Sequence, residues 1–494
     1  MDESATIEIV NDEIVTTESI NTDTSTTDYI HTDVVESNQD EEIAALKLKQ
    51  PINSAFNEEE FKAERILLLI DRFYALEEER QNQAISAEEF WRRYNEGERD
   101  FTGVNLYRIN LSRSSLAKNV NFSQTNLSAA NLSNISWNNI NLISANLLGA
   151  NLTEAYLYQA NLAEANLKNA NLHKAKLESA NLEKANLKNA NLGETNLNGT
   201  NLSNANLSCA NIRGATATYK EVNFSNANLN NANLSKTDLR GANLEGAKLQ
   251  DANFQQALYN QKTIFPTEFN ISSIGAYLID RGASLRNANL SGYDLSGLNL
   301  VYADLQGANL TSTNLSNTDL SEANLSGANL SNANLQAAKL LQANLSNANL
   351  CQTILYSTNL IASNLSFANL MEAKLHNTNL TAANLNRANL KNIQTYSVNL
   401  NCAILTKVNL VGVSLSGDLS GIILSNANLC GADLSNKNLI GADLSSADLR
   451  GANLQQANLE KANLKDANIS GANLNSANLS GATMPDGTTY QEDK

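Results

Sequence analysis

The pattern Ala-Asn-Leu-x-x, in which x is variable, recurs every five residues through most of this chain. A period of five is neither the 3.6-residue period of an α-helix nor the two-residue period of a strand. The pattern therefore predicts a chain that makes a short extended stretch and then a corner every five residues. The repeat has 69 centres, which fall in five runs, at 106–116, 122–212, 224–254, 285–415 and 424–484.

Each position of the pentad has a predicted role. The large centre residue and the small residue two before it (the Ala position) point inward and form the core. Asn or Asp directly before the centre (the Asn position) faces out or bonds the corner, because these short side chains bond nearby backbone. The two variable residues after the centre, the first and second corner positions, face solvent. Aromatic residues make up only 5% of the chain, so Leu and Ala fill this core rather than Phe and Trp.

The repeat resembles the pentapeptide-repeat family. Blocks such as Ala323-Asn324-Leu325-Ser326-Gly327 match the family consensus A(D/N)LXX, and the resemblance covers about residues 101–484. Membership implies a mainly β fold, a right-handed quadrilateral β-helix in which four pentads make one coil. About 17 coils at the strand spacing of roughly 4.8 Å would make a rod of about 80 Å. The stretches Thr263-Ile264-Phe265-Pro266 and Met484-Pro485-Asp486-Gly487 resemble an interruption and an ending found in long cyanobacterial members.

Charges spaced by four pentads are consistent with this stacking. Glu154, Lys174 and Glu194 occupy the same pentad position in successive predicted coils, and Glu164 and Lys184 repeat the arrangement on another side. Opposite charges on neighbouring strands attract one another. We therefore interpret these charges as structural.

The acidic charge of the chain lies at its N-terminus. Residues 1–50 hold 13 acids and two bases, a net −11, whereas residues 101–494 have a net charge of +1 within a total of −16. The first 50 residues are too polar to bury enough apolar surface, which predicts disorder. This acidic segment is either a solvated tail or a short interaction segment.

Residues 51–100 are predicted to be helical. Asn57 and the three glutamates after it begin one helix that runs to about residue 83, with apolar residues around most of its circumference. Ser86 and Glu89 form a capping box for a second, short helix that ends before Gly97. The pair is interpreted as a cap on the repeat, with dimerisation or partner docking as the alternative.

These patterns divide the chain into six segments. They are an acidic tail at 1–50, a helical cap at 51–100, a first repeat part at 101–258, an interruption at 259–284, a second repeat part at 285–484, and a C-terminal tail at 485–494. The consensus also fails at 214–223 and 417–423, where the sequence leaves the continuity of the coil open.

Catalytic, cofactor and metal sites are not predicted. A solid rod offers no cleft in which unlike groups could converge. The three histidines lack a recognisable partner, and the four cysteines, at 209, 351, 402 and 430, have no metal-binding spacing. We expect no enzyme activity, no cofactor, no metal and no membrane association. The absence of a signal-peptide pattern predicts a cytoplasmic protein.

One stretch of the repeat has unusually apolar corners. Seven of the 16 first corner positions between 341 and 416 are apolar or aromatic, against one of 11 in 286–336. Tyr356, His376 and Tyr396 are spaced by four pentads and are predicted to stack. Exposed apolar clusters indicate partner sites, although single exposed apolar residues are normal. The candidate partner-binding residues are Leu341, Tyr356, Ile361, Phe367, His376, Arg387, Tyr396 and Lys407.

The sequence therefore favours a non-enzymatic scaffold or binding rod with an unknown protein partner. Some members of the family mimic DNA and occupy a type II topoisomerase, but such mimicry needs an acidic rod, and this repeat is close to neutral. Direct nucleic-acid binding is not expected, because no basic stripe is present. A regulatory N-terminal segment with the rod as spacer, and a homodimer through the helical segment, remain alternatives.

Overall fold

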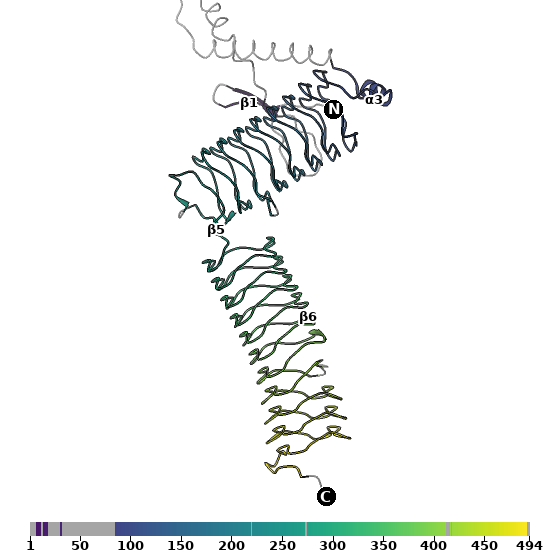
Figure 1. Ribbon diagram of the computed structural model, residues 1–494, viewed down its shortest axis with the longest axis vertical. Coiled ribbons are helices and arrows are strands. Elements are labelled where there is room, and N and C mark those ends of the chain that lie inside the picture. Colours follow the sequence, from purple (N-terminus) through teal and green to yellow (C-terminus); the bar gives the residue numbers. More distant parts are fainter. Residues whose placement is uncertain are drawn as a thin grey trace, which may run out of the picture. The chain divides into compact units, whose positions relative to one another are not determined.

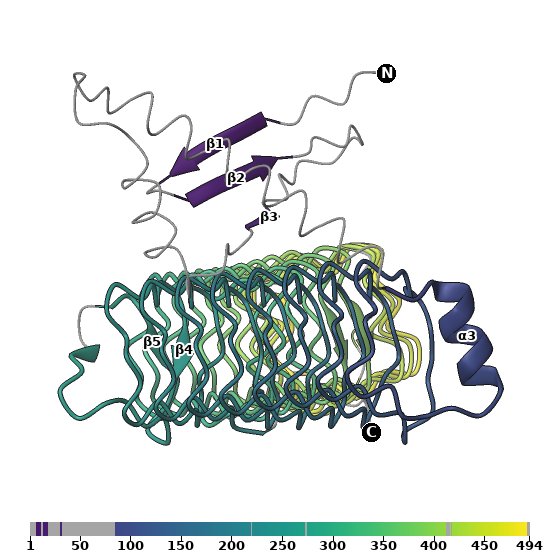
Figure 2. The same cartoon turned by 90° about the horizontal axis from the view of Figure 1, so that it is seen from above.

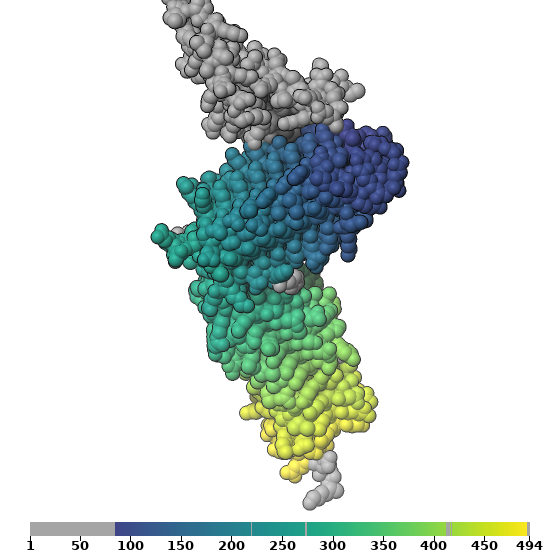
Figure 3. All heavy atoms as spheres, turned by 45° about the horizontal axis from the view of Figure 1, so that its top comes forward, coloured from purple at the N-terminus to yellow at the C-terminus, as the bar shows by residue number. Residues whose placement is uncertain are grey.

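The computed structural model describes residues 84–491, except 219, 272–273, 412–414 and 416, together with the backbone of three short strands nearer the N-terminus. The chain forms two compact units, unit 1 at Met1–Ala276 and unit 2 at Tyr277–Lys494. Each unit contains a stack of flattened coils (Figure 1). In the space-filling view, the coils of each unit appear as closely packed ridges of side chains (Figure 3).

The coils have the predicted period of four pentads. Asn126 pairs with Asn146 and Asn146 with Asn166 in parallel bridges, and the same step recurs along both units. Three backbone hydrogen bonds join neighbouring coils at a typical pentad, one of them from Gly149 N to Lys168 O at 2.9 Å. Leu147 N donates to Asn166 O at 2.7 Å, and Asn166 N donates to Ala145 O at 2.9 Å. With four pentads between bridged partners, each coil has four sides and four corners, which confirms the predicted four-sided β-helix.

The Asn position shapes the corners as predicted. The backbone N–H of Leu148, a first corner position, donates to Asn146 Oδ1 at 3.3 Å, so the asparagine fixes the beginning of the turn. Asn166 Nδ2 donates to Asn146 Oδ1 at 3.1 Å, which links the two coils. The turn closes with Ala150 N donating to Leu147 O at 3.0 Å. Asparagine therefore stabilises both the corner and the stack.

The core consists of the centre residues and the Ala positions. Leu147, Leu152 and the alanines before them are fully buried, as are most of their counterparts in both stacks. Threonine replaces alanine at several Ala positions without leaving its hydroxyl unpaired. Thr313, for example, is fully buried, and its Oγ1 donates to Leu290 O at 2.7 Å. A buried hydroxyl is tolerated here because it has a partner.

A short helix, α3 (Ala87–Asn95), covers the first coil, as the capping-box pattern predicts (Figure 2). The Ser86 hydroxyl caps it by accepting a hydrogen bond from Glu89 N at 3.2 Å. Phe90 is fully buried, and its ring lies 4.8 Å from that of Phe101. The Tyr94 hydroxyl accepts a hydrogen bond from Ala117 N. The cap interpretation of this helix is therefore consistent with the structure, whereas the helix predicted at 57–83 lies outside the described residues.

Three short strands lie within the acidic segment. β1 (Thr6–Val10) pairs antiparallel with β2 (Glu13–Thr17), and β2 pairs antiparallel with β3 (Ile30–His31). At these residues the structure differs from the prediction of disorder for 1–50. Clustered isoleucine, valine and threonine favour extended backbone there, a local preference that the segment's overall composition hides. The rest of the predicted tail lies outside the described residues.

Two of the irregular places keep the coil continuous. Asn201 pairs with Asn223, so the break at 214–223 is a coil that is two residues longer than four pentads. Ile404 pairs with Ile423, so the break at 417–423 is a coil that is one residue short of four pentads. A coil of this fold therefore accepts small insertions and deletions at a corner.

The boundary between the units falls within the predicted interruption at 259–284. Unit 1 continues its coil through β4 (Leu258–Tyr259) as far as Ile264, which pairs with Asn243. An aromatic cluster follows, in which the rings of Phe265 and Phe269 lie 5.4 Å apart and Phe269 lies 5.6 Å from Phe254. Unit 2 begins with β5 (Tyr277–Leu278).

The predicted charge ladders are present in part. Lys174 pairs with Glu194 at 3.7 Å and Lys184 with Glu164 at 3.5 Å. All four side chains are about half exposed, so each pair contributes on the order of 0.5 kcal/mol or less. These charges neutralise one another across coils, in agreement with a structural role.

The C-terminal residues fold back on the last coil. Thr489 pairs antiparallel with Thr483, and Tyr490 N donates to Ala482 O at 2.7 Å. This short segment covers the open sheet edge on one side of the coil, where unpaired backbone would otherwise face solvent.

Candidate partner-binding face

The three predicted aromatic residues form a contacting ladder in unit 2, which we call the ring ladder: Tyr356, His376 and Tyr396. The ring centroids of Tyr356 and His376 lie 4.9 Å apart with an interplanar angle of 63°. Those of His376 and Tyr396 lie 6.2 Å apart at 42°. Tyr356 and His376 are half-buried, whereas Tyr396 is 66% exposed. The sequence spacing therefore predicted the stacking correctly.

The backbone under the ring ladder is more extended than elsewhere in the stack. β6 (Lys374–His376) and β7 (Gln394–Tyr396) pair in parallel, with Lys374 opposite Gln394 and His376 opposite Tyr396. In a typical pentad the Asn side chain bonds the first corner position and starts the turn. Lysine has no side-chain oxygen for this bond, and glutamine is one methylene longer. The loss of asparagine does not by itself lengthen the strand, because Lys339 and Ile354 also lack it and form only isolated bridges.

This side of unit 2 presents six outward residues, which we call the ring face. Its members are Ile354, Tyr356, Lys374, His376, Gln394 and Tyr396. Ile354 bridges to Lys374 in the same way as β6 pairs with β7, so the patch has three rungs. The inward residue of β6, Leu375, is buried. Sheet alternation thus places two columns of side chains toward solvent.

The other predicted residues lie at different corners. Arg387 Cζ lies 5.6 Å from the centroid of the Phe367 ring, which is half exposed, and this contact is a cation–π interaction. Lys407 follows at the same corner, one coil after Arg387. Leu341 and Ile361 occupy a further corner, where Leu341 is exposed and Ile361 is half-buried.

The eight predicted residues therefore do not form one patch. The aliphatic pair follows the ring ladder by one pentad, and the Phe367 ladder follows by two. Two pentads take the chain to the opposite corner of a four-sided coil. The structure brings together the ring ladder, and separately Phe367 with Arg387, but it keeps these two sets on opposite corners.

Sequence reasoning missed the second column of the ring face. Ile354, Lys374 and Gln394 each replace the usual asparagine at the Asn position in three successive coils. The signal was visible in the repeat itself, because the other three sides of these coils keep asparagine. On one neighbouring side, for example, Asn359, Asn379 and Asn399 continue the ladder.

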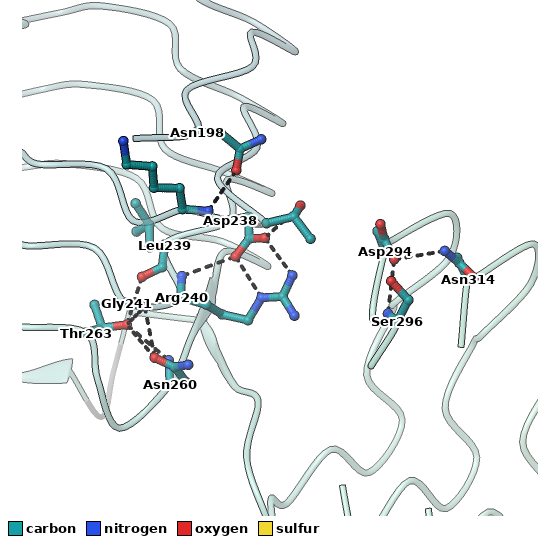
Figure 4. A network of polar contacts seen from close by, with 12 residues as sticks. Asn198, Asp238, Leu239, Arg240, Gly241, Asn260, Thr263, Asp294, Ser296 and Asn314 are labelled. Carbon is teal, nitrogen blue, oxygen red and sulfur yellow. Dashed lines mark hydrogen bonds and ion pairs between the residues drawn. The ribbon is translucent and has the colours of Figure 1, made fainter. Parts of the chain in front are cut away.

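A buried ion pair in unit 1 belongs to a polar network (Figure 4). Asp238 accepts two hydrogen bonds from the Arg240 side chain, at 2.9 and 2.7 Å, and one from Arg240 N at 3.1 Å. Asp448 and Arg450 make the same pattern on the surface of unit 2. There the bond from Arg450 holds the pKa of the Asp448 carboxyl below its ordinary value. Because the pattern recurs at equivalent pentad positions, we interpret it as a structural substitute for asparagine.

Neighbouring polar groups in this part of unit 1 also bond the backbone. Thr263 Oγ1 donates to Leu239 O at 2.7 Å, and Asn260 Oδ1 accepts a hydrogen bond from Gly241 N at 2.9 Å (Figure 4). Asp294 in unit 2 accepts hydrogen bonds from Ser296 N and Asn314 Nδ2, both at 3.0 Å. These contacts are those of ordinary corners.

The described part of the chain holds no group of three or more His, Cys, Asp or Glu side chains suited to a metal ion. Its four cysteines are free thiols. Among the same residues, no helix is both long enough and apolar enough to cross a membrane. The ring face is a place on the described surface where the side chains depart from the repeat.

Comparison with known families identifies the repeat. The family model described as "Pentapeptide repeats" matches most of residues 121–484, in the segments 121–157, 150–189, 185–218, 220–256, 281–317, 313–352, 353–392, 378–417, 422–460 and 447–484. The comparison with curated proteins gives no match.

Several solved structures are similar. HetL from the cyanobacterium Nostoc sp. strain PCC 7120, a pentapeptide repeat protein involved in heterocyst differentiation regulation, is 37% identical over 42% of this chain and 91% of its own, with a TM-score of 0.29. A second Nostoc pentapeptide repeat protein is 30% identical over 22% of this chain and 84% of its own, with a TM-score of 0.15. Rfr23 from Cyanothece 51142 is 26% identical over 36% and 96%, with a TM-score of 0.12. The chain belongs to the pentapeptide-repeat family, whose fold is the right-handed β-helix.

Proposed function

We propose that this protein is a non-enzymatic binding rod that docks another protein on the ring face. One observation carries the proposal: in three successive coils, one side replaces its asparagines with Ile354, Lys374 and Gln394 while the other sides keep theirs. Each replacement gives up hydrogen bonds that stabilise the corner and the stack. A local rule broken without a structural gain is typical of a functional site.

The side chains gained in exchange suit a protein interface. The ring ladder presents two tyrosines, of which Tyr396 is largely exposed. Tyrosine is enriched where proteins bind one another, because it offers a large rigid apolar area and a polar end. The four-sided stack holds the three rungs in fixed register, so little ordering entropy would be lost when a partner binds.

The same features favour binding over catalysis. The aromatic neighbours of His376 are Tyr356 and Tyr396, and neither is a carboxylate that could orient the imidazole. A catalytic histidine needs a sheltered substrate and an orienting partner. We also propose that the protein works in the cytoplasm, where a reducing environment would keep its free cysteines as thiols.

The test compares three forms of the full chain as baits in a lysate of the native host. The first is wild type, the second is Y356S/H376S/Y396S, and the third is Y158S. Tyr158 is a matched control, because it is an exposed tyrosine at a first corner position in unit 1. We expect the wild type and Y158S to retain a partner that the triple variant loses, with the partner's binding then repeated using purified proteins.

Thermal midpoints of the three baits must accompany the capture. The ring ladder is partly exposed, so its loss should change the midpoint little. If the triple variant binds the same partner as strongly as the wild type, the ring face is not the docking site. A triple variant that is much less stable but still binds would show that the ladder only supports the coil.

A further inference from the structure

The charges around the ring face identify the kind of partner it would accept. Between Glu322 and Asp418 the chain has one acid, Glu372, and five bases, which gives this stretch a net charge of +4 in a protein of −16. The apolar first corner positions occur in this same stretch. Exposed aromatic groups and unbalanced positive charge therefore coincide on a few coils of unit 2.

The cations nearest the ring ladder form no ion pair with a described residue, although Glu372 lies at the same corner as Lys391, one coil before it. Lys374 lies on the ring face, and Lys391 lies at the corner that borders it. Within the described part of the chain, no carboxylate lies at ion-pairing distance from either amine. The one acid of the stretch, Glu372, accepts a hydrogen bond from Gln352 Nε2 at 2.9 Å.

Several other bases of unit 2 have carboxylate partners. Arg286 pairs with Asp304 at 3.0 Å, Lys339 with Asp319 at 3.8 Å, and Arg450 with Asp448 at 2.8 Å. The repeat can therefore provide a neighbouring acid for a surface base. Beside the ring ladder an acid is present, Glu372, but no described carboxylate lies at ion-pairing distance from Lys374 or Lys391.

We infer that the ring face binds an acidic protein segment that also carries apolar or aromatic side chains, and this inference rests on the docking role proposed above. Carboxylates of the partner would pair with Lys374 and Lys391, while its apolar groups would pack on the ring ladder. Complementary charge of this kind accelerates association and selects among partners. Aromatic anchors supply most of the binding free energy in such interfaces.

A polyanionic nucleic acid fits this surface less well than a protein does. The rings of Tyr356 and His376 meet edge to face and are half-buried, so they offer no open stack for bases. Lys374 and Lys391 are few cations for a long phosphate backbone, which the net charge of −16 would repel.

The probe is a fluorescent peptide of about 15 residues in which Glu alternates with Leu and Phe, with a Gln-for-Glu peptide as its neutral counterpart. Binding to the full-length protein is followed by fluorescence anisotropy. We expect K374E/K391E to bind the acidic peptide with an affinity about tenfold or more below that of the wild type. We expect Y356S/H376S/Y396S to bind both peptides more weakly than the wild type does. Raising the salt concentration from about 0.05 M to about 0.5 M should lower the affinity of the wild type for the acidic peptide more than that of K374E/K391E.

K465E is the control for a charge reversal away from the ring face, and it reverses one lysine where the tested variant reverses two. Lys465 is an exposed first corner residue like Lys391, but it lies several coils away. We expect K465E to bind the acidic peptide within about twofold of the wild type. Equal losses in K465E and K374E/K391E would mean general electrostatic attraction and would overturn the inference. Displacement of the peptide by duplex DNA at equal charge would favour a nucleic-acid partner instead.

The inference and the proposed function can fail separately. If the wild type does not prefer the acidic peptide over its neutral counterpart, acidic recognition is wrong. The docking role would still stand if the ring-ladder variant alone lost the partner captured from the lysate. If Y356S/H376S/Y396S and K374E/K391E both keep that partner, the docking role and the acidic recognition are both wrong.

Discussion

The second corner residue of each pentad adopts left-handed backbone, whatever its side chain. Glu154, with φ 56°, and Lys174, with φ 58°, adopt it as readily as Gly431, with φ 67°. Left-handed backbone costs an L-residue about 1 kcal/mol or more, so this conformation is imposed by the turn and by stacking of the coils. Asparagine and glycine are frequent at this position because they adopt it at the lowest cost.

Two glycines at this backbone conformation differ in the space around them. At Gly417, where φ is 94°, a Cβ atom would clash with the Val398 carbonyl oxygen, whereas at Gly431 it would meet nothing within 4 Å. We expect G431A to lower the free energy of unfolding by about 1 kcal/mol and G417A by about 2–3 kcal/mol or more. Chemical denaturation measures both, and equal effects would contradict the close approach at Gly417.

Asp433 gives a prediction for pH. Its carboxyl accepts hydrogen bonds from Ser435 Oγ at 2.7 Å, Ser435 N at 3.1 Å and Asn453 Nδ2 at 3.2 Å, and these bonds hold its pKa below the ordinary value. A lowered pKa in the folded state adds stability above the unfolded pKa of about 3.9, and this stability is lost as the pH falls through the folded value.

Asn at position 433 would keep the accepting oxygen and the family consensus but would not titrate. We therefore expect D433N to resemble the wild type at pH 7 and to lose less stability than the wild type between about pH 5 and pH 2. Thermal midpoints measured across this range provide the check. Parallel curves for the two proteins would mean that Asp433 contributes nothing to the acid transition.

At the scale of elements, the ends of the stack need side chains that the repeat does not supply. Leucine and alanine fill the interior of a coil, but the first coil has no neighbour on one side. Helix α3 covers it with an aromatic cluster in which Phe90 contacts Phe101 and Phe122, with ring centroids 4.8 and 6.0 Å apart. Phe122 in turn stacks on Trp137, which lies in the same coil, with ring centroids 5.0 Å apart.

Removing the centre of this cap should loosen the first coils. We expect F90A to lower stability by about 3–5 kcal/mol, because the fully buried ring leaves a cavity. Hydrogen exchange should show faster exchange in residues 101–125, while the coils of unit 2 exchange as in the wild type. E88A, which changes an exposed residue of the same helix, is the control and should leave exchange unchanged.

At the scale of the whole molecule, the chain divides between Ala276 and Tyr277 into two compact units. Contacts in a repeat protein run mainly between neighbouring repeats, so a stack depends little on distant coils. Unit 1 also ends in its own aromatic cluster around Phe254 and Phe269. These features indicate that each unit is complete enough to fold alone.

A fragment of residues 277–494 should therefore fold by itself. We expect a β-type circular dichroism spectrum, a cooperative thermal transition, and binding of the acidic peptide within about threefold of the full chain. An unfolded fragment would mean that unit 2 requires unit 1. A folded fragment with much weaker peptide affinity would mean that residues outside unit 2 contribute to binding.

The sequence alone determined the coil, because a five-residue period with buried Leu, small Ala and corner-bonding Asn is compatible with few other folds. It also determined the stacking of Tyr356, His376 and Tyr396, because four pentads bring the chain back to the same corner. Only the tertiary structure decided which ladders share a side. Phe367 and Arg387 lie two pentads from the ring ladder, so counting along the sequence already places them at another corner. The strands β6 and β7, by contrast, place Lys374 on the same side as the ring ladder. The pairing of β6 with β7 joins residues twenty positions apart, so it depends on how neighbouring coils stack and not on the sequence of either strand alone.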